Sequence, residues 1–130
     1  MIGSETYANA ILDAVLGDDH SATIPSSLQV RLYAGSPLTG GTELSGGGYA
    51  PLAVDNDTAT WDDAVGRVKA NAVDLVFAAS SGAYSATGTH FAVTDTSGVI
   101  VVTGELGEDA TVTASGQAVR LVAGALTITA

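Results

Sequence analysis

Thr89-His90-Phe91-Ala92-Val93-Thr94-Asp95-Thr96-Ser97-Gly98-Val99-Ile100-Val101-Val102-Thr103 is the stretch that decides the fold. Residues 89–94 and 99–103 are rich in β-branched and aromatic side chains, which favour an extended backbone. Between them stands Asp95-Thr96-Ser97-Gly98, a run of turn formers that suits a tight connection between antiparallel strands. The stretch therefore predicts a β-hairpin.

Strand-like segments recur on both sides of this hairpin. Apolar and polar residues alternate with a period of two over residues 28–33 and 73–77. Further strands are expected at residues 49–54, 58–61, 67–70, 111–113, 118–122 and 126–129, with turns at Gly107-Glu108-Asp109, Ser115-Gly116 and Ala123-Gly124. Strands spaced about 8–12 residues apart, with glycine-marked turns, are typical of an antiparallel sandwich or barrel.

One segment has a helical period instead. Tyr7, Ile11 and Val15 stand at i, i+4 and i+8, which places them on one face of a helix. Ser4 is the expected N-cap, and the pattern predicts a helix over residues 4–16.

The chain of 130 residues suits one domain with one hydrophobic core. A long glycine-rich loop is expected over residues 35–48, and no internal repeat or second domain is found. The predicted fold of residues 1–130 is all-β: an antiparallel β-sandwich (jelly-roll-like) of about eight strands with one short N-terminal α-helix.

The composition excludes several functions. Fourteen acidic residues face four basic ones, for a formal charge of −10, so the surface repels phosphate backbones and anionic membranes. Cysteine is absent, which removes disulfides, thiolate catalysis and Cys-ligated zinc. The first residues lack a signal peptide pattern and no apolar run approaches a membrane span, so we expect a soluble protein that is made in a cytoplasm.

The two histidines give weak signals for chemistry. His20 follows Asp18-Asp19, a possible but unconvincing metal set because three adjacent residues rarely converge on one ion. His90 falls within the predicted strand at residues 89–94, where it should face away from Phe91 and towards a surface. No Gly-x-Ser-x-Gly nucleophile motif is present, and we predict no enzyme, no catalytic residue and no cofactor.

Two further groups of acidic residues are candidate binding sites. Asp55 and Asp57 have calcium-friendly oxygens but lack the rest of an EF-hand loop, so the binding of calcium there or at Asp18-Asp19 is left open. Asp62-Asp63 beside Trp61 suggests a carbohydrate site, whereas a Trp that anchors a loop on the core explains the same residues more simply. No metal site is predicted, and a carbohydrate- or calcium-binding module is kept as the alternative function.

A glycine-rich motif stands at residues 42–50, with the sequence Thr42-Glu43-Leu44-Ser45-Gly46-Gly47-Gly48-Tyr49-Ala50. Three adjacent glycines allow backbone angles that other residues avoid, so they indicate a sharp turn or a close approach of another backbone. No Gly-Lys-Ser/Thr follows them, which argues against a phosphate loop.

Together with other segments, this motif resembles a family of small virion proteins of tailed bacteriophages, described as tail-fibre-type or head-decoration-type. The segments that carry the resemblance run in the family's order along nearly the whole chain: residues 8–17, 30–33, 41–50, 71–77, 88–91, 95–98 and 123–129. Pro51 stands where the family typically has Arg, so a contact made by that Arg is not carried over.

The resemblance implies a non-enzymatic structural component on the exterior of a phage particle, either fibre-like on the tail or a capsid decoration. Its expected partners are other virion proteins and further copies of itself, with a host-surface glycan as a further possibility. Residues 99–102 are apolar on both faces, which predicts cover by the helix or by another subunit. The expected interface residues are Tyr7, Ile11, Val15, Gly46, Gly47, Gly48, Tyr49, Val99 and Val101.

Overall fold

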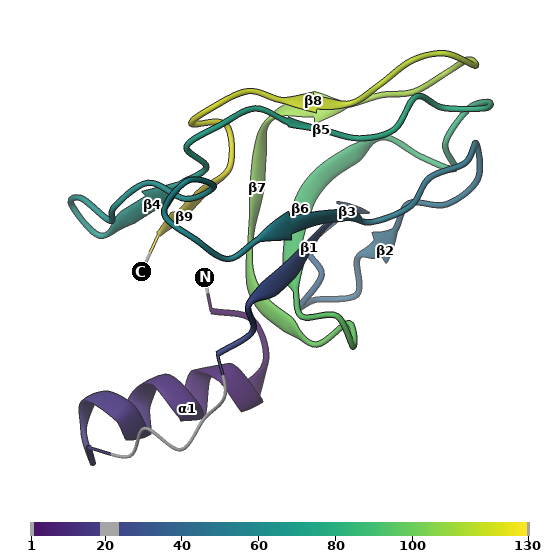
Figure 1. The fold of residues 1–130 in the computed structure, drawn as a ribbon. Helices are drawn as coiled ribbons and strands as arrows, with labels where there is room; N and C mark the ends of the chain where they lie inside the picture. The colour runs from purple at the N-terminus through teal and green to yellow at the C-terminus, as the bar shows by residue number, and fades with distance from the viewer. Residues whose placement is uncertain (1, 19–23, 130) are drawn as a thin grey trace.

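The computed structural model describes residues 2–18 and 24–129 (Figure 1). Within these ranges it has one helix and nine strands, all paired antiparallel. The elements are α1 (Glu5–Val15), β1 (Ser27–Ala34), β2 (Thr42–Glu43), β3 (Leu52–Asp55), β4 (Val68–Ala70), β5 (Leu75–Val76), β6 (Gly88–Thr94), β7 (Ile100–Ala110), β8 (Arg120–Leu121) and β9 (Thr127–Thr129). The predicted all-β sandwich with a short N-terminal helix is confirmed.

The main sheet has the strand order β2-β1-β6-β7, and β3 pairs with β1 beside β2. Val30 lies opposite Val93 and Leu32 opposite Phe91 in the β1–β6 register. All four side chains are essentially buried. The period of two thus places one face of this sheet against the core.

Two short ribbons, β5–β8 and β4–β9, form the second layer (Figure 1). Leu75 and Leu121 from the β5–β8 ribbon, with Phe77 and Leu126 next to β5 and β9, belong to the same buried cluster. Asn71 joins the ribbons from within the core: it is fully buried, and its side chain bonds the backbone of Val73, Leu121, Val122 and Leu126. A buried amide needs such partners, because an unpaired one would be costly.

The hairpin predicted at residues 89–103 is present as β6 and β7. Asp95 fixes its turn, since the Asp95 carboxylate accepts the backbone N–H groups of Ser97 at 2.9 Å and Val99 at 3.0 Å. This is the local side-chain-to-backbone bonding that makes Asp a turn former.

The second strand of this hairpin is longer than predicted. The turn expected at Gly107-Glu108-Asp109 and the separate strand at residues 111–113 are wrong, because β7 continues to Ala110. Gly88 pairs with Ala110 and His90 with Glu105, so the glycine-containing segment bulges out of the ladder without ending the strand.

Three further predictions also need correction. The loop at residues 35–48 contains the short strand β2. Residues 58–61 form a turn and not an extended segment, because the amides of Thr60 and Trp61 both bond the carbonyl of Asp57. The strand expected at residues 49–54 begins only at Leu52.

Helix α1 matches the predicted segment and is capped by Ser4, whose hydroxyl accepts the amide of Tyr7 at 3.4 Å. The backbone just before α1 adds to the edge of β7, since the amides of Gly3 and Ser4 bond the carbonyls of Val101 and Ile100. No residue of α1 is buried. In the part of the chain that the structure describes, no helix is long and apolar enough to cross a bilayer.

Candidate functional site

The triple glycine serves the interior of the molecule. Gly47 has φ +57°, and a Cβ built there would lie 2.3 Å from the carbonyl oxygen of Gly82. The carbonyl of Gly47 also accepts the amide of Ser81 at 2.8 Å. The glycines therefore let the loop before β3 lie directly on the loop at residues 80–85, because no side chain separates the two backbones.

Tyr49, the residue after the glycines, completes the edge of β1. Its hydroxyl accepts the amide of Leu32 at 2.9 Å and donates to Glu43 at 3.0 Å. Its ring stacks on Phe77 and meets Tyr84 edge-on, with centroids 6.3 and 5.5 Å apart. Burial raises the pKa of Tyr49 and Glu43 raises it further, against the opposing bond from Leu32, so the phenol stays neutral.

Glu43 links Tyr49 to a polar cluster on the outer face of the main sheet. Arg31 pairs with Glu43 at 3.2 Å and also donates to Thr94 and Gln29. This arrangement explains why Thr94 is fully buried although it faces away from the core. Tyr49 and the glycines therefore make intramolecular contacts, and their expected role in a subunit interface stays a prediction.

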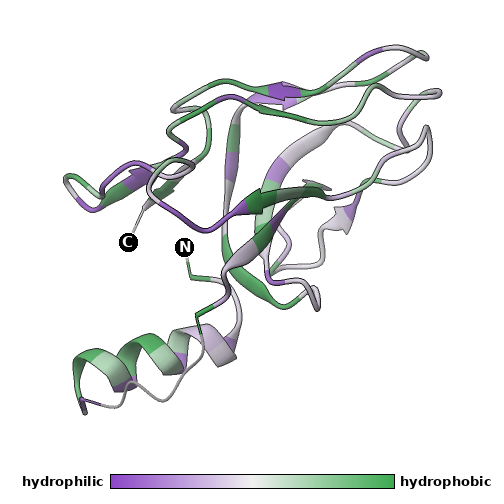
Figure 2. Cartoon of the chain, in the orientation of Figure 1, coloured by the Kyte–Doolittle hydropathy of each residue, from purple (hydrophilic) through white to green (hydrophobic). Residues whose placement is uncertain are grey.

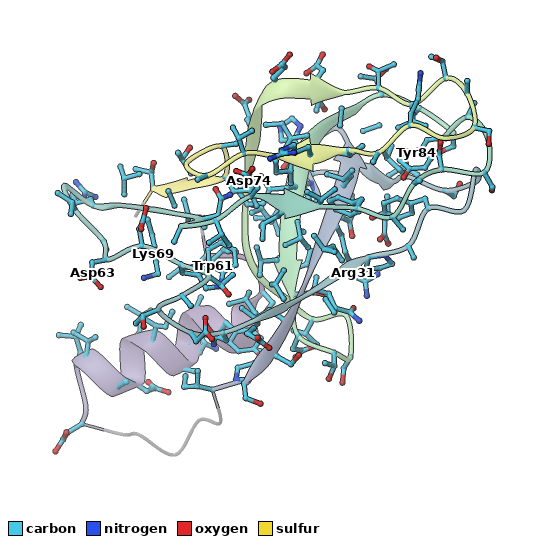
Figure 3. All side chains as sticks on the ribbon, turned by 45° about the horizontal axis from the view of Figure 1, so that its top comes forward. Arg31, Trp61, Asp63, Lys69, Asp74 and Tyr84 are labelled. Atoms are coloured by element: carbon cyan, nitrogen blue, oxygen red, sulfur yellow. The ribbon has the colours of Figure 1, made fainter. Side chains whose placement is uncertain are left out.

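An apolar groove of about 360 Å³ lies between α1 and the body of the protein. The helix lines it with Tyr7, Ala10, Ile11 and Ala14. The body lines it with Ile24, Pro25, Leu28, Asn56, Trp61, Lys69, Val93, Val101, Val102 and Ile128. Figure 3 labels Trp61 and Lys69 close together beside the helix.

The helix is tied to the body mainly at its beginning. The Tyr7 hydroxyl donates to the Asp95 carboxylate at 3.0 Å, which joins the first turn of α1 to the β6–β7 turn. Farther along, exposure rises: Ile11 is 42 % exposed, Leu12 56 %, Val15 73 % and Leu16 80 %. Figure 2 shows the hydrophobic colour along this C-terminal half of α1.

The segment at residues 99–102 is covered by its own chain along one edge. Ile2 pairs with Val102, and Val101 and Val102 line the groove beneath α1. Val99 remains 36 % exposed. The sequence predicts cover by the helix or by another subunit: α1 lies across the groove from Val101 and Val102, and a subunit contact at Val99 and Val101 stays a prediction.

Trp61 is part of the core. It is 6 % exposed, while Asp62 and Asp63 beside it are exposed. A sugar ring stacks on an accessible aromatic face, and Trp61 does not present one. Its indole N–H is the one buried side-chain polar atom without a hydrogen-bond partner among the described residues.

Among the described residues, the acidic and histidine candidates make separate local contacts. Asp57 accepts the amide of Thr60 at 2.9 Å, a turn-forming bond. His90 faces Glu105 across the β6–β7 ladder at 3.7 Å. Residues 2–18 and 24–129 contain no group of three or more His, Cys, Asp or Glu that could hold a metal. Asp19 and His20 lie outside the described residues.

Sequence reasoning did not predict the core contacts of Asn71, the Tyr7–Asp95 bond or the Arg31–Glu43 pair. A period of two shows which face a residue occupies, but it does not show which distant carboxylate or carbonyl lies opposite. The sequence gives one indication, which is the position of Arg31 in the middle of a predicted strand. An Arg there needs a partner if that face of the strand is covered.

A family model described as "Podophage GP4 fiber I protein gp80" matches residues 3–129. No curated protein matches the chain.

Proposed function

The chain belongs to the family of the podophage GP4 fiber I protein gp80, and from this premise we propose that it is an exterior accessory protein that acts through contacts with other virion proteins. The family gives the coarser role directly: this is a structural protein of a phage fibre and a component of the virion. The resemblance that the sequence suggested to a small tailed-phage virion protein is thereby confirmed.

The observation that carries the finer proposal is the exposed apolar half of α1. A soluble domain rarely leaves a run such as Leu12, Val15 and Leu16 in water, and such runs mark interaction sites. The side chains that suggested carbohydrate or calcium binding have structural roles: Trp61 packs in the core, and Asp57 stabilises a turn. The proposed protein is non-enzymatic and acts by assembly.

Several finer features belong to the same proposal. Residues 1–130 form a single domain, several copies associate, and synthesis takes place in the host cytoplasm before assembly. A fibre position on the tail is proposed ahead of a capsid decoration, because the family is a fibre family. A host-surface glycan is the proposed further ligand.

Purified particles test the proposal. Mass spectrometry should detect this protein at a fixed stoichiometry, and cryo-electron microscopy should place its density on the outside of the tail. Light scattering of the purified chain should give a mass above the 12.9 kDa of one copy. Absence from washed particles contradicts the virion role, whereas a monomer in solution contradicts only self-association.

A further inference from the structure

We propose that the outward face of α1, defined as Leu12, Val15 and Leu16, docks on a different protein whose surface has an apolar groove bordered by Lys or Arg. This inference rests on the proposed function and names the chemistry of the partner. Three features carry it: the position of the apolar side chains, the charge around them, and the charge of a second copy.

The apolar surface of α1 extends beyond what its own chain covers. Tyr7, Ala10 and Ala14 line the groove towards the body. At 100° per residue, Leu12 lies about 140–160° round the helix from these three residues and is 56 % exposed. Val15 lies about 80–140° from them, one turn beyond the groove-lining Ile11, and is 73 % exposed. A helix that is apolar on more than one side is normally covered on more than one side.

The first part of the chain carries acidic residues and no basic ones. The first 30 residues contain Glu5, Asp13, Asp18 and Asp19, and no Lys or Arg. The last turn of α1 contains the acidic residue Asp13 and no basic residue. The C-terminal carbonyls of a helix carry a partial negative charge that favours cations nearby. A partner with Lys or Arg beside an apolar groove would supply these missing cations.

A second copy of the chain is a poor source of such cations. Arg31 pairs with Glu43, and Arg120 pairs with Asp74. Lys69 lines the groove beside its own α1 and donates to the carbonyl of Asp62, and Arg67 is the fourth basic side chain. Two copies that each carry a charge of −10 also repel one another where their acidic faces meet, so the self-association proposed above would use a surface other than this one. Charge complementarity therefore favours a different, basic-rimmed protein.

The test uses phage particles assembled without this chain, to which the purified full-length protein is added back. Two double variants are matched in exposure: Leu12→Ser with Val15→Ser on α1, and Val65→Ser with Val122→Ser elsewhere, at 77 % and 53 %. The α1 variant should bind at least about tenfold more weakly than wild type, because a few buried apolar side chains carry most of an interface. The control variant should bind as wild type does.

Asp13→Lys separates docking from helix stability. A cation near the C-terminus favours the helix itself, yet it should weaken binding to a basic rim by about twofold to fivefold. Asp109→Lys, at an exposed position on β7, is the matched control. Binding of wild type should also fall between about 0.1 and about 1 M salt, over which the Debye length shrinks from ~10 to ~3 Å.

The outcomes distinguish the two levels of the proposal. If wild type binds and the α1 variants bind equally well, the docking face is wrong while the virion role stands. If sedimentation shows a wild-type oligomer that the α1 double variant dissolves, the face joins copies of this chain and the inference is overturned. If wild type is absent from natural particles and does not bind depleted ones, the proposed function falls, and the inference with it.

Discussion

Tyr49 occupies a gap that strands β2 and β3 leave along one edge of β1. Strand β3 pairs with residues 27–30 of β1, and β2 pairs with Tyr33 and Ala34. Leu32 falls between these pairings, where its carbonyl bonds the amide of Leu44 and its amide bonds the Tyr49 hydroxyl. One phenol therefore satisfies the backbone donor that a continuous strand would have paired.

Tyr49→Phe should lower the free energy of unfolding by about 1–3 kcal/mol, because the amide of Leu32 loses its partner. Urea unfolding measures the change. Tyr33→Phe is the matched control, since its hydroxyl makes no hydrogen bond among the described residues, and it should have an effect within about 0.5 kcal/mol. Equal effects of the two substitutions would contradict this role of Tyr49.

Gly47→Ala should destabilise the protein through both backbone strain and a collision with the Gly82 carbonyl. Gly116 isolates the first effect, because its φ is +84° and a Cβ there meets nothing within 4 Å. Gly116→Ala should cost about 1–2 kcal/mol and Gly47→Ala more than about 3 kcal/mol. Thermal unfolding checks the order, which a larger effect at Gly116 would refute.

Helix α1 differs from the strands in how it is held. The strands of the main sheet share one core, whereas α1 has no buried residue and is fastened near its start by Gly3, Ser4 and the Tyr7–Asp95 bond. Elements with few buried apolar contacts open locally at low free-energy cost.

Hydrogen exchange should show this difference between elements. Amides of α1 should exchange much faster than those of β6, whose Phe91, Ala92 and Val93 are buried. Tyr7→Phe should speed exchange in α1 further and leave β6 unchanged. Protection of α1 equal to that of β6 in the isolated chain would show that the helix is already packed.

At the scale of the whole molecule, two carboxylates couple stability to pH. At Asp74, the amide of Ala123 and then Arg120 lower the pKa. Burial acts to raise the pKa of Asp95, but bonds from Val99, Tyr7, Ser97 and Gly98 outweigh it, so the pKa is lowered. Both groups therefore favour the folded state when they are ionised.

The two carboxylates should contribute fully to the free energy of unfolding above about pH 4, the ordinary pKa range of an unfolded Asp. This contribution should be lost as the pH falls through their lowered pKa values in the folded state. Replacing both Asp74 and Asp95 by Asn should therefore reduce stability at neutral pH and flatten its decline in acid. Urea unfolding between about pH 6 and pH 2 tests this against Asp109→Asn. An unchanged acid profile in the double variant would contradict it.

The sequence by itself determined the features that depend on neighbouring residues. Asp95-Thr96-Ser97-Gly98 defined its hairpin because the Asp carboxylate bonds amides two and four residues away. The spacing of Tyr7, Ile11 and Val15 defined the helix, and the alternation at residues 28–33 defined the central strand. The family resemblance also followed from the order of short segments.

Only the tertiary structure decided the features that depend on segments far apart. Residues 45–47 meet residues 81–85, Trp61 enters the core, and β7 continues through a glycine that composition alone marks as a turn. It also decided which apolar side of α1 the chain covers and which it leaves in water. The physical reason is that hydrogen bonds between near neighbours depend on the spacing of residues along the chain, whereas burial depends on how the whole chain packs.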